Sequence, residues 1–300
     1  MNPPSGYATP AAFRSALTER IKERERSSPW SVAQLQRQFA YDRLLARLYL
    51  VDDGWIVKGA TALLARDLGV RGSLDIDLYR EIAQEVAEFD FRRAAELEID
   101  WMRFEIGPAR PIGDGDHAVR LPVTSRIGTT IWVQFRVDLV GSDLRMTGQP
   151  EDVPPLARGV MPDVTQRGYR AYPIVDHVAD KVAATFERHG VEQRSSTRYR
   201  DLVDLVAIVA GASVDAKLQQ AALRSEFDRR RLTLPTHFEV PDRESWERSY
   251  AIEAARSILS IAHSLGEALE VVVPFLNPLL DGRASGVWVP AAGAWLPRVS

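Results

Sequence analysis

The 300-residue sequence contains no cysteine and only four lysines, although lysine and arginine together number 38. The absence of cysteine excludes disulfides, thiolate catalysis and cysteine-based zinc or iron–sulfur sites, and it fits a cytoplasmic protein. No apolar run approaches the roughly 18–20 residues that span a bilayer. The N-terminal residues also lack the basic patch and apolar core of a secretory signal. We therefore expect a cytoplasmic protein with no membrane partner.

The charge balance is close to neutral, with a formal net charge of −3. Such a chain has no global basic field, so it is not a high-pI, sequence-independent nucleic-acid binder, although a local basic groove remains compatible with it. Because arginine supplies most of the positive charge, a surviving lysine marks a need for a compact ammonium group. Lys58 and Lys181 are two such lysines, and both lie in segments with further chemical signals.

Hydrophobic periodicity predicts an α+β fold with a mixed sheet flanked by helices, followed by a C-terminal helical domain. We expect a helical region over 1–50, a sheet domain over 51–150, and a helical domain over 151–300 that ends in an extended tail after Asn277. The strands are expected at 55–58, 73–78, 101–106, 118–124 and 130–140. The C-terminal helices are expected at 174–189, 198–210, 214–229 and 244–268.

Chemistry first appears in the alternating segment Ser73–Leu78, which reads SLDIDL. In a strand, Ser73, Asp75 and Asp77 share one face. Two carboxylates at this spacing suit Mg²⁺, and Gly72 and Ser73 suit the approach of a phosphate chain. The alternative is an exposed polar strand edge without a ligand. The opposite, buried face is expected to comprise Leu74, Ile76 and Leu78.

A further carboxylate, Asp138, lies late in the apolar strand 130–140. An aspartate there is costly to bury unless it is paired or binds a cation. If this strand lies beside SLDIDL, Asp138 joins Asp75 and Asp77. Three carboxylates suffice to hold two divalent ions for in-line displacement at phosphorus. The alternative is that Asp138 caps a turn at the strand end.

Three charged residues in the helical half are also candidates. Lys181 borders the apolar stripe of helix 174–189, where the alternative is a surface lysine whose stem lies along apolar groups. Asp201 and Asp204 lie at i and i+3 on the next helix and face the same way. Their alternative is the usual preference for acids at a helix N-terminus.

Four segments together resemble the AbiEii/AbiGii nucleotidyltransferase toxins of the polymerase β-like superfamily. KGATAL at 58–63 is similar to the family's Lys-Gly-Gly-Thr-Ala-Leu and departs at Ala60. RGSLDIDL at 71–78 resembles its Arg-x-Ser-x-Asp-Ile-Asp-Leu. Asp180-Lys181 and RYRDLVDL at 198–205 resemble its Glu-Lys and Arg-Asp-x-x-Asp-Leu helices. These segments cover about a fifth of the chain, and their order makes them specific.

The resemblance implies a nucleotidyltransferase fold and a toxin that is paired with a cognate antitoxin. It implies an NTP substrate and Mg²⁺, or Mn²⁺, as cofactor. The similar mycobacterial members add nucleotides to the 3′ end of tRNA, so tRNA or another RNA is the implied acceptor.

The resemblance also implies roles for individual residues, with Asp138 assigned by its place in the strand order and not by a shared motif. The metal ligands would be Asp75, Asp77 and Asp138. The catalytic residues would be Asp75, Asp77, Asp138, Lys181 and Asp204. The nucleotide-binding residues would be Lys58, Gly72, Ser73, Lys181 and Asp201.

Two alternatives remain at this point. One is phosphoryl or nucleotidyl transfer to a protein or small molecule, including self-modification at Ser73. The other is a catalytically silent interaction scaffold. The complete set of Ser73, Asp75, Asp77 and Lys181 argues against the scaffold, because drift would spoil some of its members.

Overall fold

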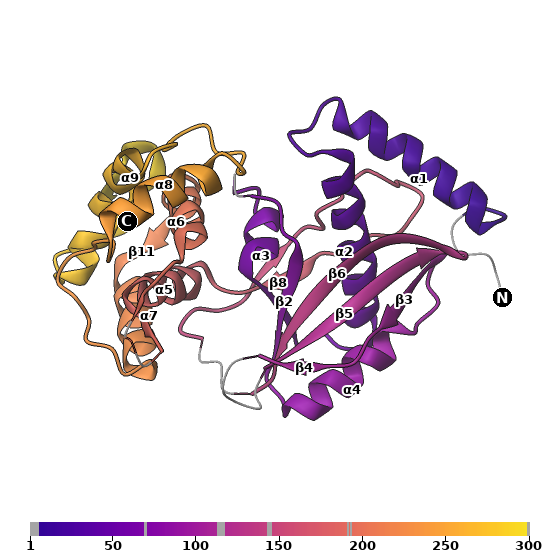
Figure 1. The fold of residues 1–300 in the computed structure, drawn as a ribbon, viewed down its shortest axis with the longest axis horizontal. Coiled ribbons are helices and arrows are strands. Elements are labelled where there is room, and N and C mark those ends of the chain that lie inside the picture. The colour runs from indigo at the N-terminus through magenta and orange to yellow at the C-terminus, as the bar shows by residue number, and fades with distance from the viewer. Residues whose placement is uncertain are drawn as a thin grey trace. The chain divides into compact units, whose positions relative to one another are not determined.

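The computed structural model describes residues 6–68, 71–112, 118–142, 146–190, 192 and 194–298. The remaining residues of the predicted regions 1–50, 51–150 and 151–300 lie outside this described part of the chain. The chain packs into two compact units (Figure 1). The first contains the described parts of Met1–Arg66, Gly72–Leu144 and Glu151–Ala171, and the second contains those of Asp67–Arg71, Arg145–Pro150 and Tyr172–Ser300. Residues 151–171, predicted as part of the helical domain, thus belong to the first unit.

The first unit is built on a mixed sheet whose described strands follow the order β3-β5-β6-β2-β1-β8-β7, with β4 paired to β5. The pairs β2–β6 and β1–β8 are parallel and the others are antiparallel, which confirms the predicted mixed sheet. The elements are α1 (Pro10–Glu25), α2 (Val32–Val51), β1 (Trp55–Lys58), α3 (Gly59–Ala65), β2 (Asp75–Arg80), α4 (Gln84–Ala95), β3 (Met102–Ile106), β4 (Arg110–Pro111), β5 (Ala118–Ile127), β6 (Thr130–Val140), β7 (Glu151–Val153) and β8 (Tyr169–Ala171).

Alternation along β2 and β6 separates a buried face from a polar face. Ile76 and Leu78 of β2 lie in the core together with Val137 and Leu139 of β6. Helices α2 and α4 pack against each other and against β3 and β6 (Figure 1). The polar residues of β2 and β6 therefore share the other face.

The prediction for Leu74 is wrong, because this side chain is 63% exposed. Strand β2 begins only at Asp75. Leu74 lies in the bend before the strand, where the alternation of faces does not yet apply. The buried face of this segment therefore starts at Ile76.

Helix α2 carries a buried carboxylate that anchors a distant loop. Asp42 is 2% exposed, and it accepts hydrogen bonds from the Leu156 amide at 3.0 Å and the Ala157 amide at 2.7 Å. The Tyr169 hydroxyl also donates to it. Burial raises the pKa of Asp42 to about 7, although the two amides oppose this shift.

This buried carboxyl predicts a pH-dependent stability. Its pKa in an unfolded chain is about 3.9, so the folded chain binds the proton more tightly and loses stability as pH rises from about 4 through about 7. We expect the unfolding free energy to fall by roughly 2–3 kcal/mol between about pH 5 and pH 8. Urea unfolding across this range measures the slope, with Asp42→Asn as the non-titrating control. Equal slopes in both proteins would rule out Asp42 as the source.

The second unit is mainly helical. Its elements are α5 (Ile174–Phe186), β9 (Arg188–His189), β10 (Arg194–Ser195), α6 (Tyr199–Gly211), β11 (Val214–Asp215), α7 (Ala216–Arg229), α8 (Arg243–Ala254), α9 (Leu265–Leu280), β12 (Val287–Val289), η1 (Pro290–Ala292) and β13 (Ala294–Leu296). Helices α5 and α7 pack together, and α6 packs against α5, α8 and α9. In the described part of the chain, no helix is both long and apolar enough to cross a membrane.

Two C-terminal predictions are wrong. The single helix expected over 244–268 is two helices, because α8 ends at Ala254 and α9 begins after the capping residue Ser264. The tail expected after Asn277 is not wholly extended, since α9 continues to Leu280. Beyond it, β12 and β13 form a hairpin that pairs with β11. Trp288 of this hairpin is buried, and its indole N–H donates to the Val209 carbonyl at 2.8 Å.

Candidate active site

A row of charged residues crosses four neighbouring strands of the first unit. Lys58 of β1 is paired in register with Asp77 of β2, Asp77 with Asp138 of β6, and Asp138 with Arg120 of β5. Directly paired residues of neighbouring strands project from the same face of a sheet. The predicted position of Asp138 beside the SLDIDL strand is thereby confirmed.

The carboxylate of Asp77 lies against the first residue of α3. Gly59 has a φ of +59°, and a Cβ atom there would lie 1.8 Å from Oδ2 of Asp77. A side chain at position 59 and the observed Asp77 rotamer are therefore mutually exclusive. Glycine also adopts this backbone conformation without the strain that other residues incur. The carboxylate of Asp77 thus has room at the junction of β1 and α3 because residue 59 is glycine.

The residues before β2 hold Asp75 in place. Ser73 is buried, and its hydroxyl donates to the Asp75 carbonyl at 2.6 Å and lies 3.3 Å from Asp75 Oδ1. The Thr61 hydroxyl of α3 also donates to the Asp75 carbonyl, at 3.2 Å. At Gly72, the nearest atoms to an added Cβ would belong to the flexible Gln34 side chain. The Ser73 hydroxyl therefore serves the start of the strand in this structure.

The predicted metal ligand Asp138 has an ion-pair partner in this structure, and the group of three metal-binding carboxylates stays a prediction. Arg120 makes a two-point ion pair with Asp138, with Nε–Oδ1 and Nη2–Oδ2 distances that are both 2.7 Å. Within the described ranges, no three Asp, Glu or His side chains converge as a metal-binding group. Both Asp138 oxygens are engaged by the Arg120 guanidinium in this structure. Asp75 and Asp77 remain, and two oxygen-donor carboxylates are a donor set that Mg²⁺ accepts.

Arg120 is a residue that the sequence did not single out. Its importance depends on the register between β5 and β6, which pairs it with Asp138. The alternation of residues 118–124 places Arg120 on a polar face, but nothing local identifies its partner. Asp138 raises the pKa of the Arg120 guanidinium by hydrogen bonding to it.

In the second unit, the predicted residues Lys181, Asp201 and Asp204 form one ion cluster. The Lys181 Nζ lies 2.9 Å from Asp201 Oδ1 and 2.7 Å from Asp204 Oδ2. Lys181 is 7% exposed and Asp204 is 1% exposed, so the surface alternative for Lys181 does not apply. Among the described residues, Asp204 Oδ1 has no hydrogen-bond partner although it is buried. One carboxylate oxygen of this cluster is therefore unsatisfied.

The electrostatics keep Lys181 and Asp201 ionised. Burial lowers the pKa of the Lys181 ammonium, but the charges of Asp201 and Asp204 outweigh burial and hold its pKa above the ordinary range. Burial raises the pKa of Asp201, and the charge of Lys181 more than reverses that effect, so its pKa lies below the ordinary range. The assignment of these three residues to nucleotide transfer stays a prediction.

We expect Lys181→Met to destabilise the protein by about 3–5 kcal/mol, because it leaves buried carboxylates without a counter-charge. Urea unfolding measures this loss. Lys217→Met is the matched control, since Lys217 is exposed on α7 and its replacement should change the free energy by less than about 0.5 kcal/mol. A Lys181→Met protein as stable as the control would contradict the ion-cluster account.

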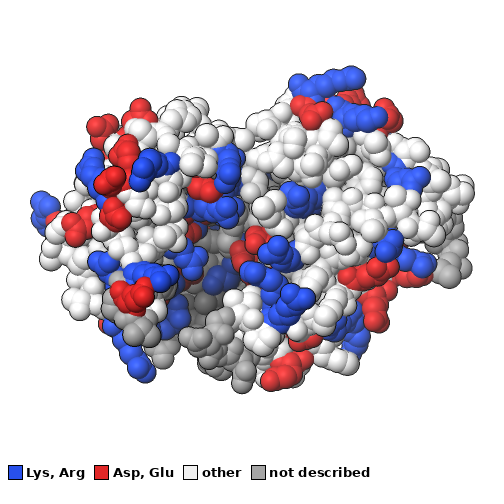
Figure 2. Space-filling view, in the orientation of Figure 1, with Lys and Arg blue, Asp and Glu red and all other residues white. Residues whose placement is uncertain are grey.

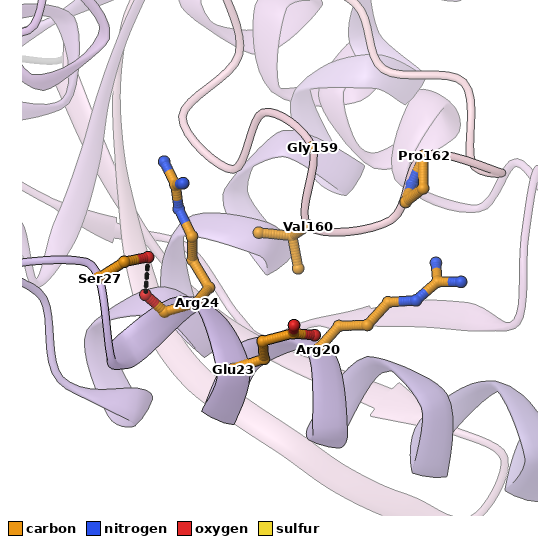
Figure 3. Close-up of a pocket in the computed structure, with 7 residues that line it drawn as sticks. All are labelled: Arg20, Glu23, Arg24, Ser27, Gly159, Val160 and Pro162. Atoms are coloured by element: carbon orange, nitrogen blue, oxygen red, sulfur yellow. Dashed lines mark hydrogen bonds between the residues drawn. The ribbon is translucent and has the colours of Figure 1, made fainter.

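A cavity of about 380 Å³ lies elsewhere in the first unit, between α1 and the loop around Gly159. Figure 3 shows Arg20 and Arg24 flanking Glu23 and Val160. The Ser27 hydroxyl donates to the Arg24 carbonyl at 3.4 Å. No residue of this cavity belongs to the charged row or to the predicted site, so it is not the candidate active site.

The first unit thus has a mixed sheet with two aspartates on one face of the inner strand β2, and the pair Lys58-Gly59 lies where β1 meets α3. Residues 43–269 match the family described as "Nucleotidyl transferase AbiEii toxin, Type IV TA system". The chain belongs to this family, and it is a nucleotidyltransferase of the toxin side of type IV toxin–antitoxin systems. The predicted family and enzyme class are therefore confirmed. No curated protein matches the chain.

Two solved structures are similar to this chain at low sequence identity. MenT4, a nucleotidyltransferase toxin from Mycobacterium tuberculosis, is 15% identical with a TM-score of 0.50, and the match covers 91% of this chain and 99% of that chain. JHP933 from Helicobacter pylori is 16% identical with a TM-score of 0.45, and the match covers 82% of this chain and 93% of that chain. The first of these likenesses confirms the predicted fold class.

Proposed function

We propose that this protein transfers a nucleoside monophosphate from an NTP to the 3′ hydroxyl of an RNA, with tRNA as the foremost candidate. We place the reaction in the cytoplasm, where a cognate antitoxin would oppose it. The observation that carries the proposal is the position of Asp75 and Asp77 on one face of β2, with Asp77 fixed against Gly59. This supports an acid pair that is held in place for a cation and a triphosphate.

The reaction we propose is an in-line displacement at the α-phosphorus. The acceptor oxygen forms a bond to that phosphorus, the bond to the bridging oxygen breaks, and pyrophosphate leaves. Asp75 and Asp77 would hold Mg²⁺, which supplies charge neutralisation at the phosphate oxygens. The protein contributes alignment and fixed charge more than covalent chemistry.

Several residues would act directly on the reactants. We assign Lys58 and Lys181 to the phosphates, on the strength of the family motifs in which they stand. Gly72 and Ser73 would lie along the phosphate chain, and Asp201 and Asp204 would hold the Lys181 ammonium. Asp138 is our candidate acceptor for the proton of the attacking hydroxyl. That role requires Arg120 to release one carboxylate oxygen.

Exposed arginines on the sheet face beside Asp75 and Asp77 support the proposal that the acceptor is an anionic molecule such as RNA. Arg136 of β6 is paired in register with Asp75, and Arg110 of β4 with Arg120. Both Arg110 and Arg136 are exposed. Figure 2 shows basic side chains gathered beside a small acidic group in the region where Figure 1 places β2, β5 and β6. Such arginines favour phosphate groups, which they bind through paired N–H donors.

The burial of Ser73 supports self-modification at this residue less than it supports transfer to an RNA. The Ser73 side chain is buried, and its hydroxyl already donates to the backbone of Asp75. A hydroxyl in that position would have to break this hydrogen bond and emerge before it could attack an α-phosphorus. Transfer to another protein or to a small molecule stays an outcome that the experiment below can reveal.

The test uses NTPs labelled at the α-phosphate, Mg²⁺ and total tRNA, with half of the tRNA oxidised by periodate so that its 3′-terminal diol is destroyed. We expect label on intact tRNA and none on oxidised tRNA. Label on the protein itself would instead support self-modification. Equal labelling of both RNA samples would refute the 3′ hydroxyl as acceptor.

A further inference from the structure

One face of helix α2 lies against the segment that precedes strand β2. Gln34, Arg37 and Tyr41 lie at i, i+3 and i+7 on this helix, so they share that face. A Cβ atom at Gly72 would lie 2.6 Å from Nε2 of Gln34. One turn beyond Arg37, the Tyr41 hydroxyl donates to the Ser73 carbonyl at 3.4 Å. These two contacts place Arg37 beside the Gly72-Ser73 segment.

The guanidinium of Arg37 has no partner among the described residues. Its Nε atom is buried and makes no hydrogen bond, and the side chain forms no ion pair in the described part of the chain. The rest of the side chain is half-buried, so Arg37 is not a surface arginine that water surrounds. Most buried polar groups in folded proteins have partners, and a buried donor without one indicates a group that acts on something else.

Arg37 also lies close to the acids of the proposed site. Burial raises the pKa of the Tyr41 hydroxyl, the charge of Arg37 opposes this rise, and the charges of Asp75 and Asp77 add to it. One buried hydroxyl thus lies within the fields of the arginine and of both acids. A cation at this place favours an anion that approaches Asp75 and Asp77, because exposed charges act on one another over about 10 Å.

From these contacts we propose that Arg37 is a substrate-binding residue whose guanidinium binds the β- and γ-phosphates of the NTP beside Gly72 and Ser73. The proposal rests on the proposed function in placing the phosphate chain along those two residues. A guanidinium binds phosphate oxygens through paired N–H donors, and the buried Nε of Arg37 supplies one of them. Arg37 precedes residues 43–269, which match the family, so no family motif assigns this role.

The experiment measures nucleotide binding to the full chain by isothermal titration calorimetry, with Mg²⁺ and without RNA. ATP, GTP, CTP and UTP are each titrated, and the NTP that binds most tightly is compared with its NMP. The variant Arg37→Met keeps an apolar stem and removes the guanidinium. We expect it to weaken NTP binding by about tenfold, and NMP binding by less than about twofold, because the NMP has no β- or γ-phosphate.

Arg26→Met is the matched control, because Arg26 is an exposed arginine of the same unit and its replacement removes the same charge. It should bind the NTP within about twofold of wild type. Thermal unfolding separates binding from folding. Since Arg37 makes no internal hydrogen bond or ion pair in the described chain, Arg37→Met should unfold at the wild-type temperature or above it. An arginine with a structural role would unfold at a lower temperature when replaced.

A second assay, filter binding of tRNA without NTP, distinguishes the phosphates of the nucleotide from those of RNA. We expect Arg37→Met to bind tRNA within about twofold of wild type. The proposal is overturned if Arg37→Met binds the NTP as tightly as Arg26→Met, or weakens the NTP and its NMP equally. It is also overturned if the variant unfolds at a lower temperature than wild type, or loses tRNA binding in place of NTP binding.

Failure of this proposal is distinguishable from failure of the proposed function. A wild-type protein that binds none of the four NTPs would refute nucleotide transfer itself. If wild type binds an NTP and Arg37→Met binds it equally well, nucleotide transfer is retained and only the role of Arg37 is removed.

Discussion

Asp77→Asn lowers nucleotide transfer by about a thousandfold, which is the largest effect expected from any single change in this protein. Asparagine keeps the shape of the side chain and removes its charge, at the position that lies between Lys58 and Asp138 in the charged row. The rate of label transfer from an NTP under saturating substrate measures the loss. Because only charge is removed, the fold should persist.

The control for this prediction is Asp53→Asn, which removes an exposed carboxylate of the same unit. It should transfer label at the wild-type rate. Circular dichroism and urea unfolding establish that both variants are folded. A folded Asp77→Asn protein with more than about a tenth of wild-type activity would contradict the assignment of Asp77 to the metal and the triphosphate.

Gly59→Ala is the second change with a large expected effect, a loss of about a hundredfold or more in transfer rate. The added Cβ would lie 1.8 Å from Asp77 Oδ2, so the carboxylate must leave its observed position. Alanine at a φ of +59° also adds about 1 kcal/mol of backbone strain. Steady-state kinetics should show the loss mainly in kcat, because the displaced group acts on the reacting phosphate.

Gly159→Ala is the matched control for this strain. Gly159 has a φ of +73°, and no atom lies within 4 Å of the Cβ that alanine would add. Both variants should lose stability through the backbone strain, and only Gly59→Ala should lose transfer activity. If both keep wild-type kinetics, the close approach of Gly59 to Asp77 has no part in the reaction.

The two faces of strand β2 could be predicted because they depend only on the order of residues within the strand. The alternation of Asp75, Ile76, Asp77 and Leu78 fixes two faces within one strand, and the structure keeps Ile76 and Leu78 in the core. The predicted burial of Leu74 was wrong because the alternation of polar and apolar residues gives the period of the strand but not the residue at which the strand starts. Where β2 begins depends on the hydrogen bonds of Ser73 and Thr61 to Asp75, which connect separate elements.

The partner of Asp138 could not be predicted for a similar reason. The sequence places an aspartate late in an apolar strand and requires some compensation for it, either a cation or an ion pair. Arg120 stands on a different strand, and only the β5–β6 register brings it opposite Asp138. The same holds for Lys181, because its pairing with Asp201 and Asp204 depends on how α5 packs against α6.

The C-terminal errors have a different physical cause. Pro274 and Pro278 lie inside α9, although proline usually ends a helix because it lacks an N–H and clashes with the preceding turn. Tertiary packing compensates here, since Phe275, Leu276 and Leu279 are all buried. Helix α9 therefore continues through two prolines that the local preference of proline would place outside a helix.

The central claim is that the Asp75/Asp77 site moves a nucleotidyl group onto RNA. The most direct measurement supplies each NTP in two forms, labelled at the α-phosphate or at the γ-phosphate, to the wild-type protein with Mg²⁺ and total tRNA. We predict label on RNA from the α-labelled form alone, and none with Asp77→Asn. Label transferred from the γ-phosphate, or α-label that reaches RNA equally well with Asp77→Asn, would contradict the account.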